Sequence, residues 1–210
     1  MLNSLEILQP DDWHVHLREG DMLKMVTNFS SRINNRCVVM PNTIEPITDT
    51  NKAIFYKNEI TKASSTNFEP LIPCYLTESL DVENFRMGLQ KKFFFGAKLY
   101  PANATTNSKS GVSNITNIYK LFEILEEEDS PLLIHGEKVS ENIDIFDREK
   151  HFIDDELVKI RDKFPKLRIV LEHVSTEYGV KFIKSNKNIA GSITPHHMLL
   201  TKEDVFFDNK

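Results

Sequence analysis

Short apolar runs recur along the chain, and their spacing constrains the fold more than any other feature. Several are almost continuously hydrophobic, as expected of parallel strands that are buried on both faces. About 20 to 35 residues separate several neighbouring runs, enough for a loop, a helix and a return loop. The runs are 13–16, 37–40, 71–76, 93–100, 132–135, 167–173 and 189–194. They predict an α/β fold with a parallel sheet of seven strands, one short of a closed (β/α)8 barrel.

The segments between these runs carry the signals of helices. Apolar residues at helical spacing predict a helix from Ile115 to Glu128, with Asn114 as its cap. Further helices are predicted over Asp154–Phe164 and Glu177–Ser185. No repeat, low-complexity tract or linker-like stretch divides the sequence, so we predict one domain over residues 1–210.

Composition argues against several classes of function. A net charge of −5 is unlike a broad nucleic-acid-binding surface. No apolar run approaches the roughly 18 residues of a membrane span, and the first residues lack the features of a signal peptide. All seven glycines are isolated, so neither a Rossmann fingerprint nor a P-loop is present. Cys37 and Cys74 lie in apolar segments and are predicted to be free core thiols of a cytoplasmic protein.

Histidines at the ends of three predicted strands are the most informative candidates for chemistry. His14 and His16 are two residues apart, which places both side chains on one face of the first strand. His135 and His173 end two later strands, and the carboxyl ends of barrel strands converge on one mouth. Each histidine alone is more often an ordinary core or surface residue. Together they favour a metal site.

Lys98 is unusual because it ends a strongly apolar run. The pattern alone favours a lysine whose ammonium reaches solvent along the protein surface. The alternative is a desolvated, neutral amine that reacts with carbon dioxide, since a buried ammonium without a partner is costly. The resulting carbamate has two oxygens that could bridge two metal ions.

Other polar residues are weaker candidates for the same mouth. Arg18 could bind a substrate carboxylate with its planar guanidinium, although a surface ion pair is the alternative. Asn42 follows the second strand, where a turn residue is equally expected. The polar run 103–108 suits a mobile loop. His196 and His197 could line the mouth but are not predicted to be ligands.

These residues lie in segments that resemble the dihydroorotases of the single-function bacterial type, within the amidohydrolase superfamily. The segments are DDWHVHLR (11–18), MPNT (40–43), KLYPANATTNS (98–108), PLLIHGE (131–137), IDIFDR (143–148), EH (172–173) and ITPHHML (193–199). They follow one another in family order over nearly the whole chain. The segment 98–108 is highly specific, whereas His-x-His alone belongs to many amidohydrolases.

The resemblance implies a (β/α)8 barrel of the amidohydrolase kind with a binuclear zinc centre. His14 and His16 would bind one ion, and His135 and His173 would bind the other. N6-carboxylated Lys98 would bridge the two Zn²⁺ ions.

The implied reaction is the reversible conversion of N-carbamoyl-L-aspartate to L-dihydroorotate in pyrimidine biosynthesis, with a metal-bridging hydroxide as nucleophile. Arg18, Asn42 and His135 would bind this small-molecule substrate, and Thr105 and Thr106 would lie on a loop that closes over it. The family also suggests a homodimer. Two alternatives are another cyclic-amide hydrolase, such as a hydantoinase or allantoinase, and a non-catalytic barrel that binds metal or a partner chain.

The family also has an aspartate at the end of an eighth strand, as a metal ligand and proton shuttle. No matching segment precedes Lys210. We therefore expect the catalytic residue to lie outside this sequence, the barrel to lack its C-terminal part, and the 210-residue chain to have little or no dihydroorotase activity. An unclosed barrel is expected to leave two exposed sheet edges.

Overall fold

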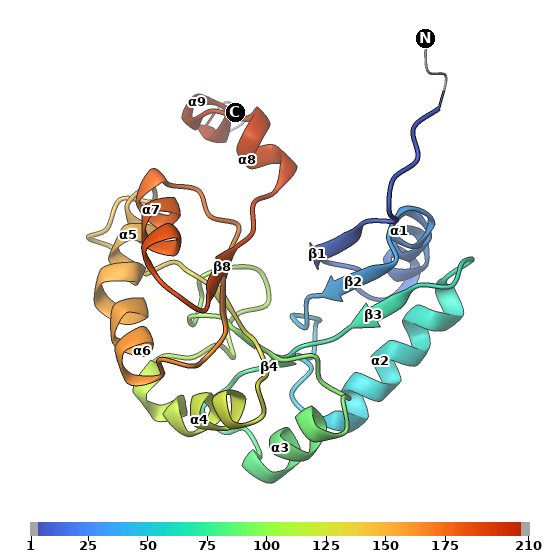
Figure 1. Cartoon of the computed structure of the whole chain (residues 1–210), viewed down its shortest axis with the longest axis horizontal. Helices are drawn as coiled ribbons and strands as arrows, with labels where there is room; N and C mark the ends of the chain where they lie inside the picture. Colours follow the sequence, from blue (N-terminus) through green and yellow to red (C-terminus); the bar gives the residue numbers. More distant parts are fainter. Residues whose placement is uncertain (1–3, 207–210) are drawn as a thin grey trace.

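The computed structural model describes residues 4–206, in which parallel strands form the inner wall of an open ring and helices surround it (Figure 1). The strands are β1 (Asp11–Val15), β2 (Arg36–Val39), β3 (Glu69–Leu71), β4 (Cys74–Tyr75), β5 (Ala97–Leu99), β6 (Leu132–His135), β7 (Ile169–Glu172) and β8 (Ile189–Gly191). The larger helices are α1 (Gly20–Ile33), α2 (Thr50–Ala63), α3 (Val82–Gln90), α4 (Tyr119–Glu127) and α7 (Glu177–Ser185). The shorter helical segments are η1 (Ile115–Ile118), α5 (Arg148–Phe152), η2 (Ile153–Leu157), α6 (Val158–Lys163), α8 (Pro195–Leu199) and α9 (Lys202–Phe206).

The strands form two parallel sheets, in the orders β1-β2-β3 and β4-β5-β6-β7-β8. The run 71–76, predicted as one strand, is divided between β3 and β4 at Ile72 and Pro73. Proline has no N–H to donate to a neighbouring strand, which favours an interruption there. β3 pairs with β2 and β4 pairs with β5, so the interrupted run still joins neighbouring positions of the ring. The prediction of seven strands was therefore wrong by this one division.

Two of the predicted helices match the structure closely. The first is a 3-10 turn, η1, followed by α4, and Asn114 Oδ1 accepts a hydrogen bond from Thr116 N–H at 3.0 Å. The third is α7, which begins and ends where the pattern predicts. The Thr176 hydroxyl oxygen caps α7 by accepting from Gly179 N–H at 3.0 Å. Local side-chain caps therefore set both helix starts.

The predicted start of the middle helix, at Asp154, was wrong. Helical structure begins at Arg148 and continues through the π-helical segment η2 to Lys163. The first turn carries Glu149, which is buried because it accepts hydrogen bonds from the loop after β7. A buried carboxylate at this position conceals the apolar pattern that would mark the helix start.

The apolar core lies mainly between the strands and the surrounding helices. A second, smaller cluster is formed by Val38, Met40 and Leu133 with Leu71, Phe95 and Val170 packed against them. Four of these residues, Leu71, Phe95, Leu133 and Val170, line a cavity inside the ring. Close approach of neighbouring strands requires a small residue at one position. A Cβ at Gly96 would lie 2.4 Å from Pro131 O, at the start of the β5–β6 pairing.

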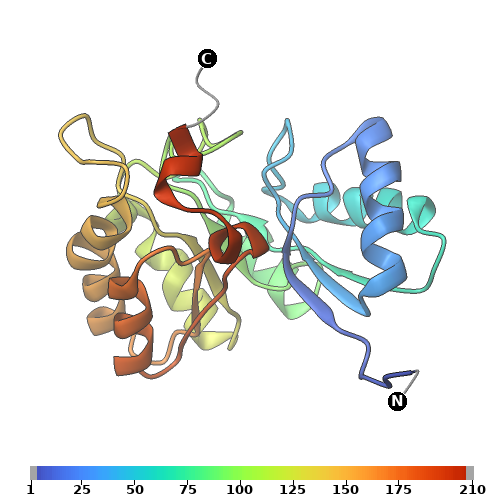
Figure 2. The same cartoon turned by 90° about the horizontal axis from the view of Figure 1, so that it is seen from above.

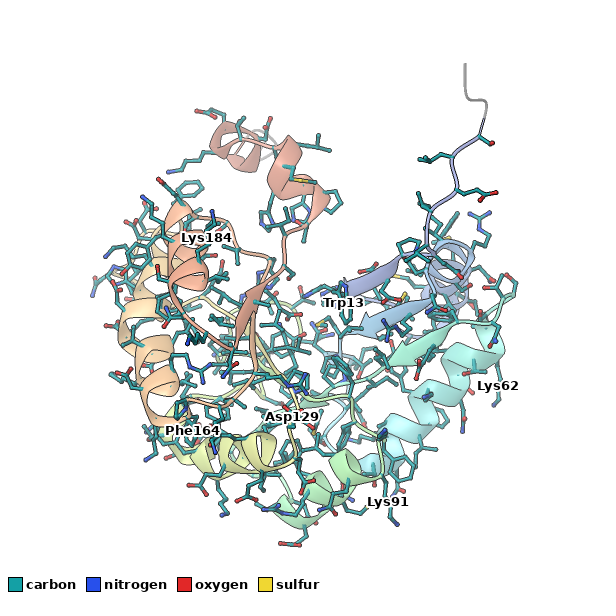
Figure 3. All side chains as sticks on the ribbon, viewed as in Figure 1. Trp13, Lys62, Lys91, Asp129, Phe164 and Lys184 are labelled. Carbon is teal, nitrogen blue, oxygen red and sulfur yellow. The ribbon has the colours of Figure 1, made fainter. Side chains whose placement is uncertain are left out.

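β1 and β8 face each other across the opening of the ring and are edge strands of their sheets among the described residues. Figure 2 shows the same arrangement from above, with the three-stranded sheet on one side and the five-stranded sheet on the other. A cavity of about 1050 Å³ separates the two edges. Trp13 borders this cavity and is half exposed at the opening (Figure 3).

In the part of the chain that the structure describes, no helix has both the length and the apolar character needed to cross a membrane.

Candidate metal centre

The carboxyl ends of β1, β5, β6 and β7 bring the five predicted metal ligands into one cluster. These are His14 in β1, His16 directly after β1, Lys98 in β5, His135 in β6, and His173 directly after β7. The ring centroids of His14 and His173 are 5.4 Å apart, and those of His135 and His173 are 4.6 Å apart. Residues that are up to 159 positions apart in sequence thus converge because parallel strands present their ends at the same edge.

The nitrogens are grouped in two pairs. His14 Nε2 lies 3.2 Å from His16 Nε2, and His135 Nδ1 lies 3.1 Å from His173 Nε2. When two nitrogens bind the same tetrahedral zinc ion at roughly 2.0–2.1 Å, they lie about 3.3 Å from each other. Donor atoms of His14, Glu172 and His173 also lie within 4.8 Å of one another. The donor types and spacing of these side chains fit zinc.

Burial keeps the imidazoles of His14, His16 and His173 in the form that binds metal. Desolvation lowers the pKa of His14 to about 3. The pKa of His16 is also lowered to about 3 by burial, with His14 and Arg18 adding to the effect. Burial lowers the pKa of His173 as well. A neutral imidazole has a free nitrogen lone pair for a metal ion, whereas an imidazolium has none.

Lys98 is fully buried, with 0% of its surface exposed, so the prediction that its ammonium reaches solvent was wrong. Its side chain points into the ring, where Nζ contacts Glu172 Oε2 and lies 4.8 Å from the centre of the Tyr100 ring. Desolvation therefore holds the pKa of Lys98 well below its usual range. The apolar run in the sequence marks burial correctly but does not say that the lysine itself faces inward.

Glu172 is a site residue that the sequence pattern did not single out. It is 1% exposed, and its Oε1 accepts from His14 Nδ1 at 2.9 Å while Oε2 contacts Lys98. The acceptor fixes the proton on His14 Nδ1 and leaves Nε2 free toward His16. A carboxylate that ends an otherwise apolar strand directly before His173 is the signal that could have identified it.

Glu137 has the same relation to the second pair of histidines. His135 Nε2 donates to Glu137 Oε2 at 3.1 Å, which leaves His135 Nδ1 free toward His173. Burial opposes ionisation of Glu137, but the hydrogen bond from His135 holds its pKa below the usual range. Each half of the cluster therefore has a carboxylate that orients one of its imidazoles.

The backbone at His173 takes an uncommon conformation, with φ at 43°, in the left-handed region. Its N–H donates to Ser192 Oγ at 3.0 Å, and Val174 N–H donates to Ser192 O at 2.8 Å. Glu149 accepts from Ser175 N–H at 2.9 Å and fixes the residues that follow. These contacts from β8 and α5 hold the turn that directs the His173 ring toward the other histidines.

Asn42 connects β2 to the loop after β5. It is buried, its Nδ2 donates to Thr106 O at 3.0 Å, and its own carbonyl accepts from Asn107 Nδ2 at 3.1 Å. Thr105 and Thr106 are exposed on this loop. The interpretation of Asn42 as a simple turn residue is therefore incomplete, because it also anchors a loop from a neighbouring strand.

Arg18 follows β1 in a left-handed conformation with φ at 59°, and Tyr56 O–H donates to its carbonyl at 2.8 Å. Its side chain is half-buried and forms no ion pair with any residue that the structure describes. His196 and His197 lie on α8, where both contact the Thr194 hydroxyl. They are exposed, and no hydrogen bond joins either of them to the five clustered side chains in the described residues.

No family model matches the chain. It is 47% identical to the dihydroorotase of Buchnera aphidicola subsp. Schizaphis graminum, over 99% of this chain and 60% of that protein. It is 46% identical to the dihydroorotase of Yersinia pseudotuberculosis, over 95% of this chain and 58% of that protein. The chain is homologous to the dihydroorotases. It spans about 60% of the length of these relatives.

Solved dihydroorotase structures agree with this relationship. That from Campylobacter jejuni superposes with a TM-score of 0.87 at 35% identity, over 95% of this chain and 58% of that one. The Saccharomyces cerevisiae dihydroorotase, solved in complex with 5-fluoroorotic acid, gives 0.87 at 33% identity, over 95% and 59%. The L-hydantoinase of Arthrobacter aurescens gives 0.75 at only 14% identity, which shows a shared fold alone. The predicted amidohydrolase barrel, present in part, is confirmed.

Proposed function

We propose that this chain carries the metal centre of a dihydroorotase, a zinc-dependent cyclic amidohydrolase that interconverts N-carbamoyl-L-aspartate and L-dihydroorotate in pyrimidine biosynthesis. The observation that carries the proposal is the convergence of Lys98 with two pairs of histidines in a chain homologous to dihydroorotases. The much lower identity to hydantoinases favours this activity over that of other cyclic-amide hydrolases.

In this proposal, His14 and His16 hold one zinc ion, and His135 and His173 hold the other. Bound zinc would act as a Lewis acid toward the cyclic amide carbonyl and would activate water for attack. Glu172 and Glu137 hold the ring protons of His14 and His135 on the nitrogens that face away from their partners. They thereby keep one nitrogen of each ring available.

Lys98 is the proposed bridge, in its N6-carboxylated form. Burial favours the neutral amine, which is the form that reacts with carbon dioxide. Nζ forms a bond to the carbon of carbon dioxide and loses a proton, which Glu172 is placed to accept because it contacts that amine. The product is a carbamate with two oxygens at a position that the histidines surround.

The proposed substrate-binding residues are Arg18, Asn42 and His135. Arg18 has a guanidinium free to form a bidentate contact with a substrate carboxylate. Asn42 joins this region to the loop that carries Thr105 and Thr106, which we propose closes over bound substrate. His135, which belongs to the second pair of histidines, would also contact the substrate. Closure would exclude water from the reacting amide.

We further propose a single barrel domain over residues 1–210, a cytoplasmic location and a homodimer. The free, buried thiols of Cys37 and Cys74 are consistent with a reducing compartment.

Binding of L-dihydroorotate and of hydantoin to the zinc-loaded 210-residue chain, compared by calorimetry, tests the proposed activity. We expect dihydroorotate to bind at least tenfold more tightly, and Arg18→Ala to remove most of this difference. The proposal is overturned if hydantoin binds equally well, or if neither compound binds to folded, zinc-loaded protein.

A further inference from the structure

Tyr100 borders the metal centre and has no role in the function proposed so far. It directly follows β5, two residues after Lys98, and is 2% exposed. Its ring centroid lies 6.2 Å from that of His135 and 5.0 Å from that of Tyr75. Lys98 Nζ lies 4.8 Å from its ring centre. Tyr100 therefore shares a wall with the proposed bridging lysine and with one of the proposed zinc ligands.

The phenolic oxygen of Tyr100 is buried and has no hydrogen-bond partner within the described part of the chain. Buried hydroxyls almost always have one, because an unpaired polar group loses its hydration without compensation. The other buried tyrosines follow this rule. Tyr56 O–H donates to Arg18 O at 2.8 Å, and Tyr75 O–H donates to Asn107 O at 3.3 Å. Thr27 Oγ1 and Ser31 Oγ on α1 are also unpaired, but among the three buried tyrosines of the described residues only Tyr100 has an unpaired hydroxyl.

Contacts around Tyr100 connect it to the predicted substrate-binding residues. Its carbonyl accepts from Val112 N–H at 2.8 Å, which closes the base of the loop that carries Thr105 and Thr106. Its ring packs on Tyr75, which bonds Asn107, and Asn107 in turn bonds Asn42. The Asn42 side chain also acts on the His16 ring through a hydrogen bond. Tyr100 therefore belongs to one contiguous set of side chains with Asn42 and a proposed zinc ligand.

The unpaired phenol is a hydrogen-bond donor at neutral pH. A phenol has an ordinary pKa of about 10, so the hydroxyl keeps its proton at neutral pH and can donate to an oxygen of a bound anion.

We infer that Tyr100 is a substrate-binding residue whose O–H donates to an oxygen of the substrate carboxylate, on the side of the site where Tyr75 and Asn107 connect it to Asn42. This inference rests on the proposed function, because it assigns the ligand of the same site. It explains why a buried hydroxyl lacks a partner within the protein: its partner is supplied by the ligand. It also makes Tyr100 a determinant of specificity for cyclic amides that carry a carboxylate.

The test compares Tyr100→Phe with wild type and with a matched control, Tyr119→Phe, on the zinc-loaded 210-residue chain. Tyr119 lies on α4 and packs against Phe164, on the outside of the ring. Two ligands are titrated by calorimetry: L-dihydroorotate and dihydrouracil, which is the same ring without the carboxylate. The thermal midpoint of each metal-free, ligand-free protein is measured in parallel.

We expect Tyr100→Phe to weaken dihydroorotate binding by about tenfold or more, as for loss of a hydrogen bond to a charged group, and to leave dihydrouracil binding unchanged. Its thermal midpoint should equal or exceed that of wild type, since the variant removes an unpaired buried hydroxyl. Tyr119→Phe should change neither affinity.

Equal binding of dihydroorotate by Tyr100→Phe and wild type overturns the inference and leaves the proposed function intact. A midpoint lower by several degrees overturns it too, because the hydroxyl would then have a structural partner. Equal losses for both ligands overturn the assignment to the carboxylate. If wild type binds no dihydroorotate, the proposed function fails, and the role of Tyr100 fails with it.

Discussion

The five-stranded sheet supplies Lys98, His135 and His173 from three neighbouring strands, whereas the three-stranded sheet supplies His14 and His16 from one strand end. In the larger sheet, strand pairing sets the spacing of the ligands, because His135 is in register with Glu172 and Lys98 with Leu133. No described strand pairing joins β1 to β7 or β8. The first pair of histidines is therefore positioned from the other sheet by a side chain, Glu172, which contacts His14 across the ring.

The comparison teaches that the two halves of the site depend on different interactions. Pairing of β6 with β7 sets the spacing of the second pair of histidines. The first pair lies on β1, which pairs with β2, and it contacts the larger sheet through the buried Glu172 carboxylate. The orienting carboxylates differ in the same way. The Glu172 side chain is 0% exposed and that of Glu137 is 35% exposed. Substitutions that weaken zinc binding by one half of the site should leave zinc binding by the other half measurable.

The largest effect is expected for Lys98→Met, which keeps a long side chain but removes the amine. Without the bridge, we expect zinc content to fall from about two ions per chain to one or fewer, as measured by elemental analysis. The Glu172 carboxylate would also lose a buried partner, so the free energy of unfolding should fall by about 3 kcal/mol in urea titrations. Unchanged zinc content in a folded variant would contradict this role of Lys98.

Glu172→Gln should have the next largest effect, and it should act mainly on the half that contains His14. Loss of a carboxylate that orients a metal-binding imidazole lowers affinity about 10- to 100-fold. Chelator competition should therefore show one zinc released more readily than the other. Glu137→Gln is the matched comparison, and we expect a smaller loss because its carboxylate is partly solvated. Equal losses for both variants would show that the two halves are held in the same way.

Gly96→Ala tests the role of strand pairing in the larger sheet. A Cβ there would lie 2.4 Å from Pro131 O, so β5 and β6 would have to move apart. We expect the free energy of unfolding to fall by about 1 to 3 kcal/mol, the usual cost of overpacking. A variant as stable as wild type in urea titrations would show that the close approach of β5 to β6 does not contribute to the free energy of unfolding.

The smallest effect concerns the two thiols, one in each sheet. Burial raises the pKa of Cys37 to about 12, and that of Cys74 well above its ordinary value of 9.0. Both should resist a thiol reagent at pH 8 until the chain unfolds, and both should then react at the same rate. Faster reaction of Cys37 would show that the three-stranded sheet opens separately.

The same raised pKa gives a pH dependence with a definite sign. Between pH 9 and about 12, the unfolded state ionises at Cys37 while the folded state does not. Stability contributed by this thiol is therefore fully present below pH 9 and is lost as the pH rises through that range. In urea titrations, we expect the free energy of unfolding of wild type to fall more steeply with pH over this range than that of Cys37→Ser. Equal slopes for the two proteins would show that Cys37 is not the cause.

The sequence predicted most of the strands and the five candidate ligands that the structure brings together, because both depend on local signals. β6 and α7 were predicted at their observed bounds, since a short buried run and a polar cap mark their ends clearly. The division at Ile72 and Pro73 was not predicted, because an apolar run can be continuous in sequence while its backbone pairing is interrupted.

The orientation of single side chains was beyond local signals. Lys98 was expected to reach solvent, but it is fully buried. Apolar neighbours predict that a strand is buried, but they do not show toward which side of the strand a single side chain points. Glu172 and Tyr100 gain their significance only from residues on other strands, which are distant in sequence. The start of the middle helix depended on Glu149, whose partners follow β7. Such tertiary contacts are set by the assembled sheet.

We propose that these two pairs of histidines and Lys98 form a binuclear zinc site. The most direct test is the number of zinc ions per folded chain, measured by elemental analysis after loosely bound metal is removed, for wild type, His14→Ala and His135→Ala. The account predicts about two ions in wild type and about one in each variant. A folded wild-type protein with well under one ion per chain would contradict it.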